Sequence, residues 1–344
     1  MTLPTTTKAL TLREGGYAAG PMAAVPESMG AHVQLGDMPL PALKPGQVLI
    51  QVIMAPVNPS DLFFVQGSYG QPRVQGNAAG FEGVGRVLAS GGGKTADALI
   101  GARVAFLGTV TGTWAAHAVS DAALCIPLRD DLRDADGAAL IVNPLTAVAL
   151  LERVREAGSD AFILNAAGSQ LGRLILGLAR DQGLKALAVI RRDRDAQALR
   201  DLGAGEVLVS SAPDFTAQAG AAIKAHKPRV LLDAVGDQVT ADLFFAMPSG
   251  AQWVIYGKMS DEAPKLDQLG QLIFMNKRAE GFWLSRWLPA APPDRRQAVI
   301  EDVQARFASG KWETRVAATL TLEQAVDGIL PAMADSAGKV MLTP

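Results

Sequence analysis

The amino-acid sequence predicts an α/β protein with two domains, an antiparallel, barrel-like β domain and a doubly wound parallel sheet. Roughly the first 125 residues carry short β-rich runs separated by glycine turns, which is typical of antiparallel sheets. Beyond them, short apolar runs alternate with helical patterns, which is typical of parallel strands buried on both faces. The chain has 344 residues, 49% of them hydrophobic, and this is enough to form two cores.

The first domain is predicted from its strands. Lys44-Pro45-Gly46 is a turn signal, and it introduces a β-rich run over 47–55. Glycines crowd residues 76–93, and short strands are expected over 83–88 and 103–107. We expect no substantial helix in this part of the chain.

The second domain is predicted from a change of pattern near residue 125. Asn143, as an N-cap followed by Pro144, predicts the start of a helix that Gly158 ends. After this helix, strands and helices alternate. The expected strands cover 161–164, 186–190, 206–209, 230–233 and 252–256, and the expected helices cover 170–182, 195–202, 213–225 and 237–246. Such alternation requires a parallel sheet of the kind that binds nucleotides.

The last part of the chain loses this alternation after residue 270. It contains an aromatic-rich run over 281–287, a helical pattern near 294–308 and a final strand around 340–342. We expect this tail to return to the first domain. The predicted domains are therefore 1–126 with 279–344, and 127–278.

Composition excludes several classes of function. A net charge of −2 offers no basic field for nucleic acid. The single cysteine, Cys125, excludes an internal disulfide and a cysteine-rich zinc site, and it is expected to be buried as a small apolar side chain. Neither a targeting segment nor a membrane-spanning run is recognisable, so we expect a cytoplasmic protein without a membrane partner.

A turn of small residues follows the strand predicted at 161–164. In Asn165-Ala-Ala-Gly168-Ser-Gln-Leu-Gly172, small side chains let the backbone approach a pyrophosphate at the start of a helix. The dinucleotide pattern G-x-G-x-x-G would place glycines at Ala167 and Ser169, so the motif is degenerate. Taken alone, such a segment is more often a plain strand-turn-helix than a phosphate site.

Spacing favours the nucleotide interpretation. Arg191 lies nineteen residues after Gly172, at the end of the next predicted strand, where such folds meet the adenosine ribose. Arg191 and Arg192 can clamp a 2′-phosphate, which predicts NADPH as the cofactor. Alternatively, both are solvated charges in the run 191–195, and Arg194 is another candidate for the second phosphate ligand.

Several motifs resemble the medium-chain dehydrogenase/reductase superfamily. They are Lys44-Pro-Gly-Gln-Val-Leu-Ile, Asn58-Pro-Ser-Asp61, Gly80-Phe-Glu-Gly-Val-Gly85 and the nucleotide turn. The resemblance implies a GroES-like β-barrel catalytic domain and a Rossmann cofactor domain. Zinc members carry a histidine where Phe81 stands and a cysteine near Asp61, which this chain lacks. Its histidines, His32, His117 and His226, are dispersed, so we expect no metal site.

Within the zinc-free branch, the chain is similar to the trans-2-enoyl thioester reductases. The similarity lies in residues 58–70, Asn143-Pro-Leu-Thr-Ala, Tyr256-Gly-Lys-Met and Gly281-Phe-Trp-Leu-Ser-Arg-Trp287. The resemblance implies Tyr69 as the catalytic residue and Arg191 with Arg192 on the 2′-phosphate. It implies further cofactor contacts at Asn143, Gly168, Ser169, Gln170, Leu171, Gly172, Tyr256, Gly257, Lys258, Met259, Phe282, Trp283, Leu284 and Lys339. The family shows Gly-Gly-Met where this chain has Gly257-Lys258-Met259.

The implied activity is hydride transfer from NADPH to the β-carbon of a 2-enoyl thioester, with Tyr69 hydrogen-bonding the oxyanion or protonating the α-carbon. Asn58, Phe63, Trp283 and Trp287 are candidates for the substrate pocket. Phe63 and its neighbour Phe64 are equally compatible with an ordinary core. Reduction of a quinone or an α,β-unsaturated ketone is the alternative, and a cofactor-binding protein without catalysis is a third possibility. The resemblance also implies a homodimer.

Overall fold

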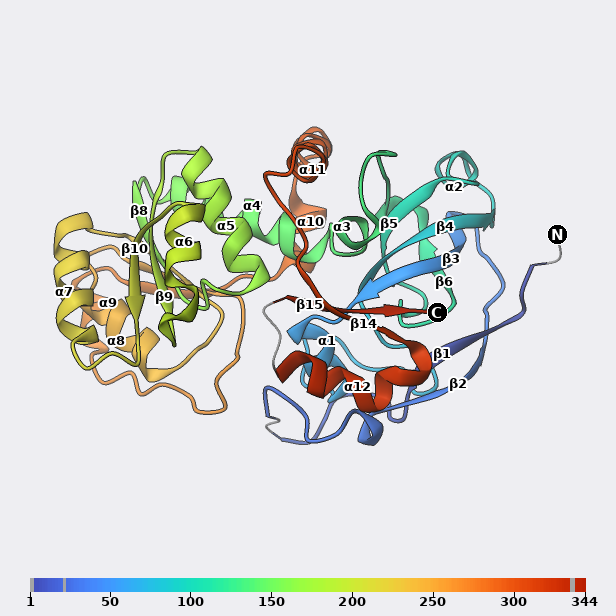
Figure 1. The fold of residues 1–344 in the computed structure, drawn as a ribbon, viewed down its shortest axis with the longest axis horizontal. Helices are drawn as coiled ribbons and strands as arrows, with labels where there is room; N and C mark the ends of the chain where they lie inside the picture. The colour runs from blue at the N-terminus through green and yellow to red at the C-terminus, as the bar shows by residue number, and fades with distance from the viewer. Residues whose placement is uncertain (1–2, 21–22, 335–337) are drawn as a thin grey trace. The chain divides into compact units, whose positions relative to one another are not determined.

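The computed structural model describes residues 3–20, 23–334 and 338–344. Within these residues the chain divides into two compact units (Figure 1). Unit 1 comprises Met1–Val142 and Ile300–Pro344, and unit 2 comprises Asn143–Val299. This division differs from the expected boundaries near 126 and 279. Two observations account for the difference: the strand Cys125–Pro127 and the helix Asp134–Ala138 contact strands of unit 1, and a strand over 278–281 joins the sheet of unit 2.

Unit 1 is built on a seven-stranded sheet with the order β14-β15-β3-β4-β5-β7, in which β6 pairs with β3. Its strands are antiparallel except for the parallel pair β14 and β15, and β1 and β2 form a separate antiparallel pair. The strands are β1 Thr6–Leu12, β2 Val33–Pro39, β3 Gln47–Pro56, β4 Glu82–Ser90, β5 Arg103–Leu107, β6 His117–Asp121, β7 Cys125–Pro127, β14 Val316–Thr321 and β15 Lys339–Thr343.

Unit 1 contains helices, but in the first 125 residues, where the sequence analysis expected no substantial helix, the longest described helix has seven residues. The α-helices are α1 Pro59–Val65, α2 Lys94–Ala98, α3 Asp134–Ala138 and α12 Leu322–Ala334, and the short 3-10 helices are η1 Met29–Ala31 and η2 Ala122–Leu124. The helix α12 lies against β14 and β15 (Figure 1). A buried cluster around Trp114 joins α1, α12 and the neighbouring strands into one core.

Unit 2 is a parallel six-stranded sheet with the order β10-β9-β8-β11-β12-β13 (Figure 1). This order is that of a dinucleotide-binding fold, in which successive strands are added in one direction from β8 to β10 and in the opposite direction from β11 to β13, so that the strand order reverses between β8 and β11. The strands are β8 Ala161–Leu164, β9 Lys185–Ile190, β10 Ala204–Val209, β11 Val230–Asp233, β12 Gln252–Ile255 and β13 Arg278–Gly281. The first five were expected from the sequence, and β13 was not.

The helices of unit 2 connect these strands. They are α4 Val142–Glu156, α5 Gln170–Asp181, η3 Asp193–Asp195, α6 Ala196–Leu202, α7 Phe215–His226, α8 Gln238–Ala246, α9 Gly270–Phe274 and α10 Leu284–Ala290, while α11 Pro293–Ala308 runs into unit 1. The helix α4 begins at Val142, so Asn143 lies in its first turn and is not the N-cap that the sequence predicts.

Candidate active site

The turn after β8 has the form of a phosphate-binding turn. The Ser169 side chain accepts a hydrogen bond from the Gly172 amide at 3.1 Å, which makes Ser169 the N-cap of α5. A Cβ on Gly172 would lie 2.5 Å from the Ala167 carbonyl oxygen, so only glycine lets the helix approach the turn this closely. A Cβ on Gly168 would make only ordinary contacts, with Asp195 Oδ2 at 3.9 Å and Ile190 Cγ2 at 4.0 Å. We call this uncrowded stretch of backbone, at the positive end of α5 where a phosphate can bind, the Gly168 opening.

Ala166 shapes this turn at an energetic cost. Its φ of 47° lies in the left-handed region, which costs an L-residue other than glycine about 1–2 kcal/mol. The Ser169 amide donates to the Ala166 carbonyl oxygen at 2.9 Å, and this bond closes the turn. Strained backbone of this kind often lies at ligand sites.

A buried polar network supports the turn from below, and the sequence analysis did not identify it. Asn165, directly after β8, donates to Asp233 and to Thr240 and accepts from the Ala234 amide at 2.8 Å. Asp233, the last residue of β11, also accepts from the Trp253 indole at 2.7 Å. The network joins the carboxyl ends of β8 and β11, where such sheets bind ligands. Asn165 directly follows the apolar strand β8 and Asp233 ends the apolar strand β11, and a polar residue at the end of such a strand was the signal available in the sequence.

The predicted cofactor segment at Tyr256 is held by the backbone of Asp233, a member of the same network. The amides of Tyr256 and Gly257 donate to the Asp233 carbonyl oxygen at 2.8 and 3.2 Å. A Cβ on Gly257 would lie 2.6 Å from the Ala234 carbonyl oxygen, so glycine is required there. Burial raises the pKa of the Tyr256 phenol, whose oxygen is buried without a hydrogen bond among the described residues. Lys258 and Met259 are exposed.

The second predicted cofactor segment follows β13. The Phe282 amide donates to the Ile255 carbonyl oxygen at 2.8 Å, which places this segment beside the end of β12. Trp283 is the N-cap of α10, a helix without a buried residue, and Arg286 lies over the Trp283 ring at 5.7 Å. Phe282, Trp283, Leu284 and Trp287 are all half-buried, so each retains surface for a ligand.

Arg191 and Arg192 come directly after β9 and are exposed. Neither side chain has a hydrogen-bond or ion-pair partner among the residues that the structure describes. Arg194 pairs with Asp195 at 3.4 Å. The two cations beside the open turn are therefore available to a phosphate, whereas the Arg194 charge is partly compensated. Together with the Gly168 opening, this arrangement fits a phosphorylated dinucleotide.

Tyr69 lies in unit 1 on a loop after α1. Its ring is half-buried and packs against Phe81, with ring centroids 4.9 Å apart and planes inclined by 40°. Phe64 packs on the same Phe81 ring at 4.9 Å and is only 8% exposed, so it belongs to the core. Phe63, its neighbour, is half-buried and remains a candidate for the substrate pocket.

Beneath Phe81, four polar side chains form a buried cluster: Asn58, Asp61, Glu82 and Lys339. The Asn58 side chain donates to Glu82 at 3.0 Å and accepts from the Lys339 ammonium. The Asp61 carboxylate accepts hydrogen bonds from the backbone amide of Asn58 at 2.7 Å and from the backbone amide of Phe81 at 3.0 Å. The sequence analysis placed Asn58 and Lys339 at the site, and the structure brings these two side chains together.

Burial sets the protonation of this cluster. Loss of solvation raises the pKa of Asp61 to about 7, and it raises the pKa of Glu82 as well. The same cause lowers the pKa of Lys339, and the charges of Glu82 and Asp61 oppose that shift. Glu82 also accepts from the amides of Ile141 and Val142 at 3.1 and 2.9 Å. It therefore fixes the backbone directly before Asn143.

Metal ligands do not gather in the described part of the chain. No group of three or more histidine, cysteine, aspartate or glutamate side chains there could hold a metal ion. Cys125 is buried, and burial raises the pKa of its thiol to about 12, so a thiolate ligand is disfavoured there. Within the same residues, no helix is both long and apolar enough to cross a membrane.

Comparisons with known proteins agree with this geometry. The alcohol dehydrogenase GroES-like domain family matches residues 44–130. The mitochondrial enoyl-[acyl-carrier-protein] reductase of Bos taurus is 33% identical over 283 residues, which cover 78% of this chain and 73% of the relative. The chain belongs to the medium-chain dehydrogenase/reductase superfamily. Like its relatives in the enoyl thioester and quinone reductase branch, this medium-chain reductase is an oxidoreductase.

Solved structures confirm the two-domain fold of this medium-chain reductase. A Mesorhizobium loti protein, provisionally named NADPH:quinone reductase, superposes with a TM-score of 0.95 at 44% identity, and the match covers both chains fully. A mitochondrial 2-enoyl thioester reductase heterodimer from Candida tropicalis gives a TM-score of 0.80 at 21% identity over 98% of this chain and 100% of its own. The structure of Etr1p in complex with NADP and crotonyl-CoA gives the same TM-score, identity and coverage.

Proposed function

We propose that this chain is an NADPH-dependent reductase that reduces the double bond of a 2-enoyl thioester without a metal. The observation that carries the proposal is Tyr69, a half-buried phenol on a glycine loop, in a chain 33% identical to an enoyl-[acyl-carrier-protein] reductase. Loops that present a polar side chain from a rigid core commonly carry catalysis. We keep the carrier, coenzyme A or acyl carrier protein, as an open choice.

The residues of unit 2 would bind the cofactor, which supplies a hydride for the β-carbon of the substrate. The Gly168 opening and the start of α5 would receive the pyrophosphate, while Arg191 and Arg192 would hold the 2′-phosphate. Asn165 and Asp233 would fix the segments that surround the cofactor. The hydrogen bonds of Asn165 and Asp233 join parts of the protein itself, so these segments are already in place before the cofactor binds.

The residues of unit 1 would act on the substrate. Negative charge develops on the thioester carbonyl oxygen when the β-carbon accepts hydride, and a phenol is a suitable donor for it. Tyr69 would donate a hydrogen bond to this oxygen or deliver a proton to the α-carbon. Phe63 of unit 1 is half-buried and would contact the acyl chain, with about 0.8 kcal/mol gained per buried methylene. Trp283 and Trp287, which belong to unit 2 and are also half-buried, stay candidates for the same role from the sequence.

A quinone or an α,β-unsaturated ketone is the second candidate substrate. The Mesorhizobium loti protein, 44% identical over its full length, carries the name of a quinone reductase. The same hydride transfer would then act on a flatter acceptor. Turnover of NADPH with crotonyl-CoA, a benzoquinone and a simple enone, measured side by side, separates these candidates. Turnover of the quinone alone contradicts the thioester assignment, and no turnover with any acceptor indicates a binding protein.

Replacement of Tyr69 tests the catalytic role. We expect Tyr69→Phe to lower kcat for crotonyl-CoA by about 10²–10³-fold, because a positioned donor to a developing oxyanion contributes that much. The dissociation constant for NADPH, measured by fluorescence titration, should stay within about twofold, since the phenol contributes nothing to cofactor binding in this scheme. Tyr17→Phe, which removes an exposed phenol of the same unit, is the matched control. If Tyr69→Phe loses affinity for NADPH, the role of the tyrosine is structural and not catalytic.

A homodimer in the cytoplasm completes the proposal. The Candida tropicalis structure is a heterodimer, which supports pairing of two chains here. The cytoplasmic location stays a prediction from the sequence.

A further inference from the structure

The loop that carries Tyr69 is fastened at both ends. It runs from Gly67 to Arg73. At its first residue, the Gly67 carbonyl oxygen accepts a hydrogen bond from the Ala18 amide at 2.9 Å. Its last residue exchanges two backbone hydrogen bonds with Gly16, at 2.9 and 3.2 Å. Both ends are thus attached to the same short segment near the start of the chain, and Tyr69 lies between them.

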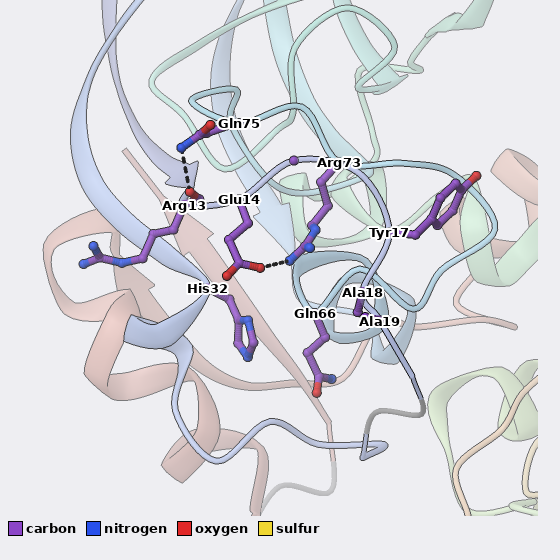
Figure 2. Close-up of a pocket in the computed structure, with 10 residues that line it drawn as sticks. Arg13, Glu14, Tyr17, Ala18, Ala19, His32, Gln66, Arg73 and Gln75 are labelled. Carbon is purple, nitrogen blue, oxygen red and sulfur yellow. Dashed lines mark hydrogen bonds and ion pairs between the residues drawn. The ribbon is translucent and has the colours of Figure 1, made fainter.

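The Arg73 side chain gathers three segments at one point. Its Nε donates to the Gly16 carbonyl oxygen at 3.1 Å, and its Nη1 donates to the carbonyl oxygen of Val65, the last residue of α1, also at 3.1 Å. The same Nη1 lies 3.1 Å from a carboxylate oxygen of Glu14 (Figure 2). Arg73 is only 5% exposed, whereas the Glu14 side chain is 66% exposed. A planar guanidinium can serve several acceptors at once, which a single amine cannot do in this geometry.

Gly67 shows how closely the guanidinium supports the loop. A Cβ on Gly67 would lie 2.7 Å from Arg73 Cζ and 2.8 Å from the Ala18 nitrogen, and the φ of Gly67 is +80°. The first and last residues of the loop are therefore in contact through the guanidinium. Arg73 and Gln66 also border a surface hollow of about 590 Å³ (Figure 2). Hydrogen bonds, more than apolar packing, hold the ends of the loop.

We propose that Arg73 is a positioning residue that fixes the loop 67–73 and thereby sets the place of the Tyr69 phenol. The inference rests on the proposed catalytic role of Tyr69. Fixing the backbone of each residue costs conformational entropy, so a loop with free ends would sample many conformations. The clamp, meaning Arg73 with its contacts to Gly16, Val65 and Glu14, restricts this sampling before substrate binds. A misplacement of about 1 Å can lower a rate by about 10²-fold.

A double-mutant cycle distinguishes positioning from general stabilisation. We expect Arg73→Met to lower kcat by about 10–100-fold in the folded protein, with the KM for NADPH unchanged. In a Tyr69→Phe background the same substitution should lower kcat by no more than about twofold, because the clamp then has no phenol to place. Equal factors in both backgrounds would overturn the proposal.

Conservative and control variants sharpen the cycle. Arg73→Lys keeps the buried charge but has one nitrogen for several acceptors, so its kcat should lie between those of the wild type and Arg73→Met. It also serves as the test if Arg73→Met does not fold. Arg13→Met removes an exposed guanidinium that borders the same hollow, and its kcat should equal that of the wild type.

Hydrogen exchange tests the clamp without reference to activity. In Arg73→Met or Arg73→Lys, the amides of residues 66–73 should exchange at least about tenfold faster, while those of β3 should keep their wild-type rates. Unchanged exchange of the loop would overturn the proposal even if the enzyme is active. If the wild type reduces no acceptor, the proposed function fails, and the exchange rates still decide whether Arg73 holds the loop.

Discussion

Arg191 and Arg192 illustrate what single residues decide in this molecule. Both are exposed directly after β9, and the structure leaves their charges uncompensated within the described residues, whereas Arg194 pairs with Asp195. Exposed cations contribute little to stability. Their position directly after β9 is the one from which the sequence predicts contact with the 2′-phosphate, so their role in selecting the cofactor stays a prediction.

Replacing both arginines should change cofactor preference. We expect Arg191→Ala with Arg192→Ala to weaken NADPH binding by about 10–100-fold, because charge-assisted hydrogen bonds to the 2′-phosphate are lost. NADH lacks that phosphate, so its dissociation constant should change by less than about threefold. Fluorescence titration of both cofactors measures the two effects. Arg200→Ala, which removes an exposed arginine of α6, is the control. An equal loss of affinity for NADPH and NADH would contradict binding of the 2′-phosphate by Arg191 and Arg192.

At the scale of elements, the helix α1 shows why sequence reasoning was incomplete. It has seven residues, too few for a visible helical periodicity, and its signals are Asn58 before Pro59 and the carboxylate of Asp61. Strands β8 to β12 were predictable because burial on both faces leaves continuous apolar runs. The strand β13 was not predictable, because it is an edge strand without a buried residue. Likewise, the role of Asp233 depends on side chains that are distant in sequence.

The end of α1 that bears Asp61 should make stability depend on pH. The pKa of Asp61 in the fold, about 7, lies above the ordinary value of about 3.9, so between these values the folded state binds more protons than the unfolded state. The free energy of unfolding should therefore fall as pH rises through that window. Asp61→Asn removes this titration and keeps an acceptor oxygen for one of the two backbone amides, those of Asn58 and Phe81, which donate to separate oxygens of the carboxylate.

Urea unfolding at pH 5 and pH 8 measures this effect. We expect the wild type to lose stability between the two, and we expect Asp61→Asn to reduce that loss by about 1 kcal/mol or more. Asp97→Asn, on the exposed face of α2, should keep the wild-type difference. If Asp61→Asn loses as much free energy of unfolding between pH 5 and pH 8 as the wild type, another group, such as Glu82, controls the pH dependence.

At the scale of the whole molecule, the parallel sheet of unit 2 ends in an unprotected edge. The edge strand β13 has no partner on its outer side among the described strands. The nearby helix α9 exposes Ile273 at 73% and Phe274 at 86%. Edge strands are usually shielded, and exposed apolar groups of this size commonly mark an interface. A second copy can cover both features at once, since an edge strand can pair with its own symmetry mate.

Disrupting this edge should separate the proposed dimer. We expect the wild type to elute with about twice its 36.0 kDa mass in light-scattering chromatography. Ile273→Lys with Phe274→Lys should shift the protein toward the monomer, because burying two charges at an apolar interface is costly. Ile100→Lys, at an exposed apolar residue of unit 1, should leave the mass unchanged. A double variant that remains fully dimeric at micromolar concentration would place the interface on another surface.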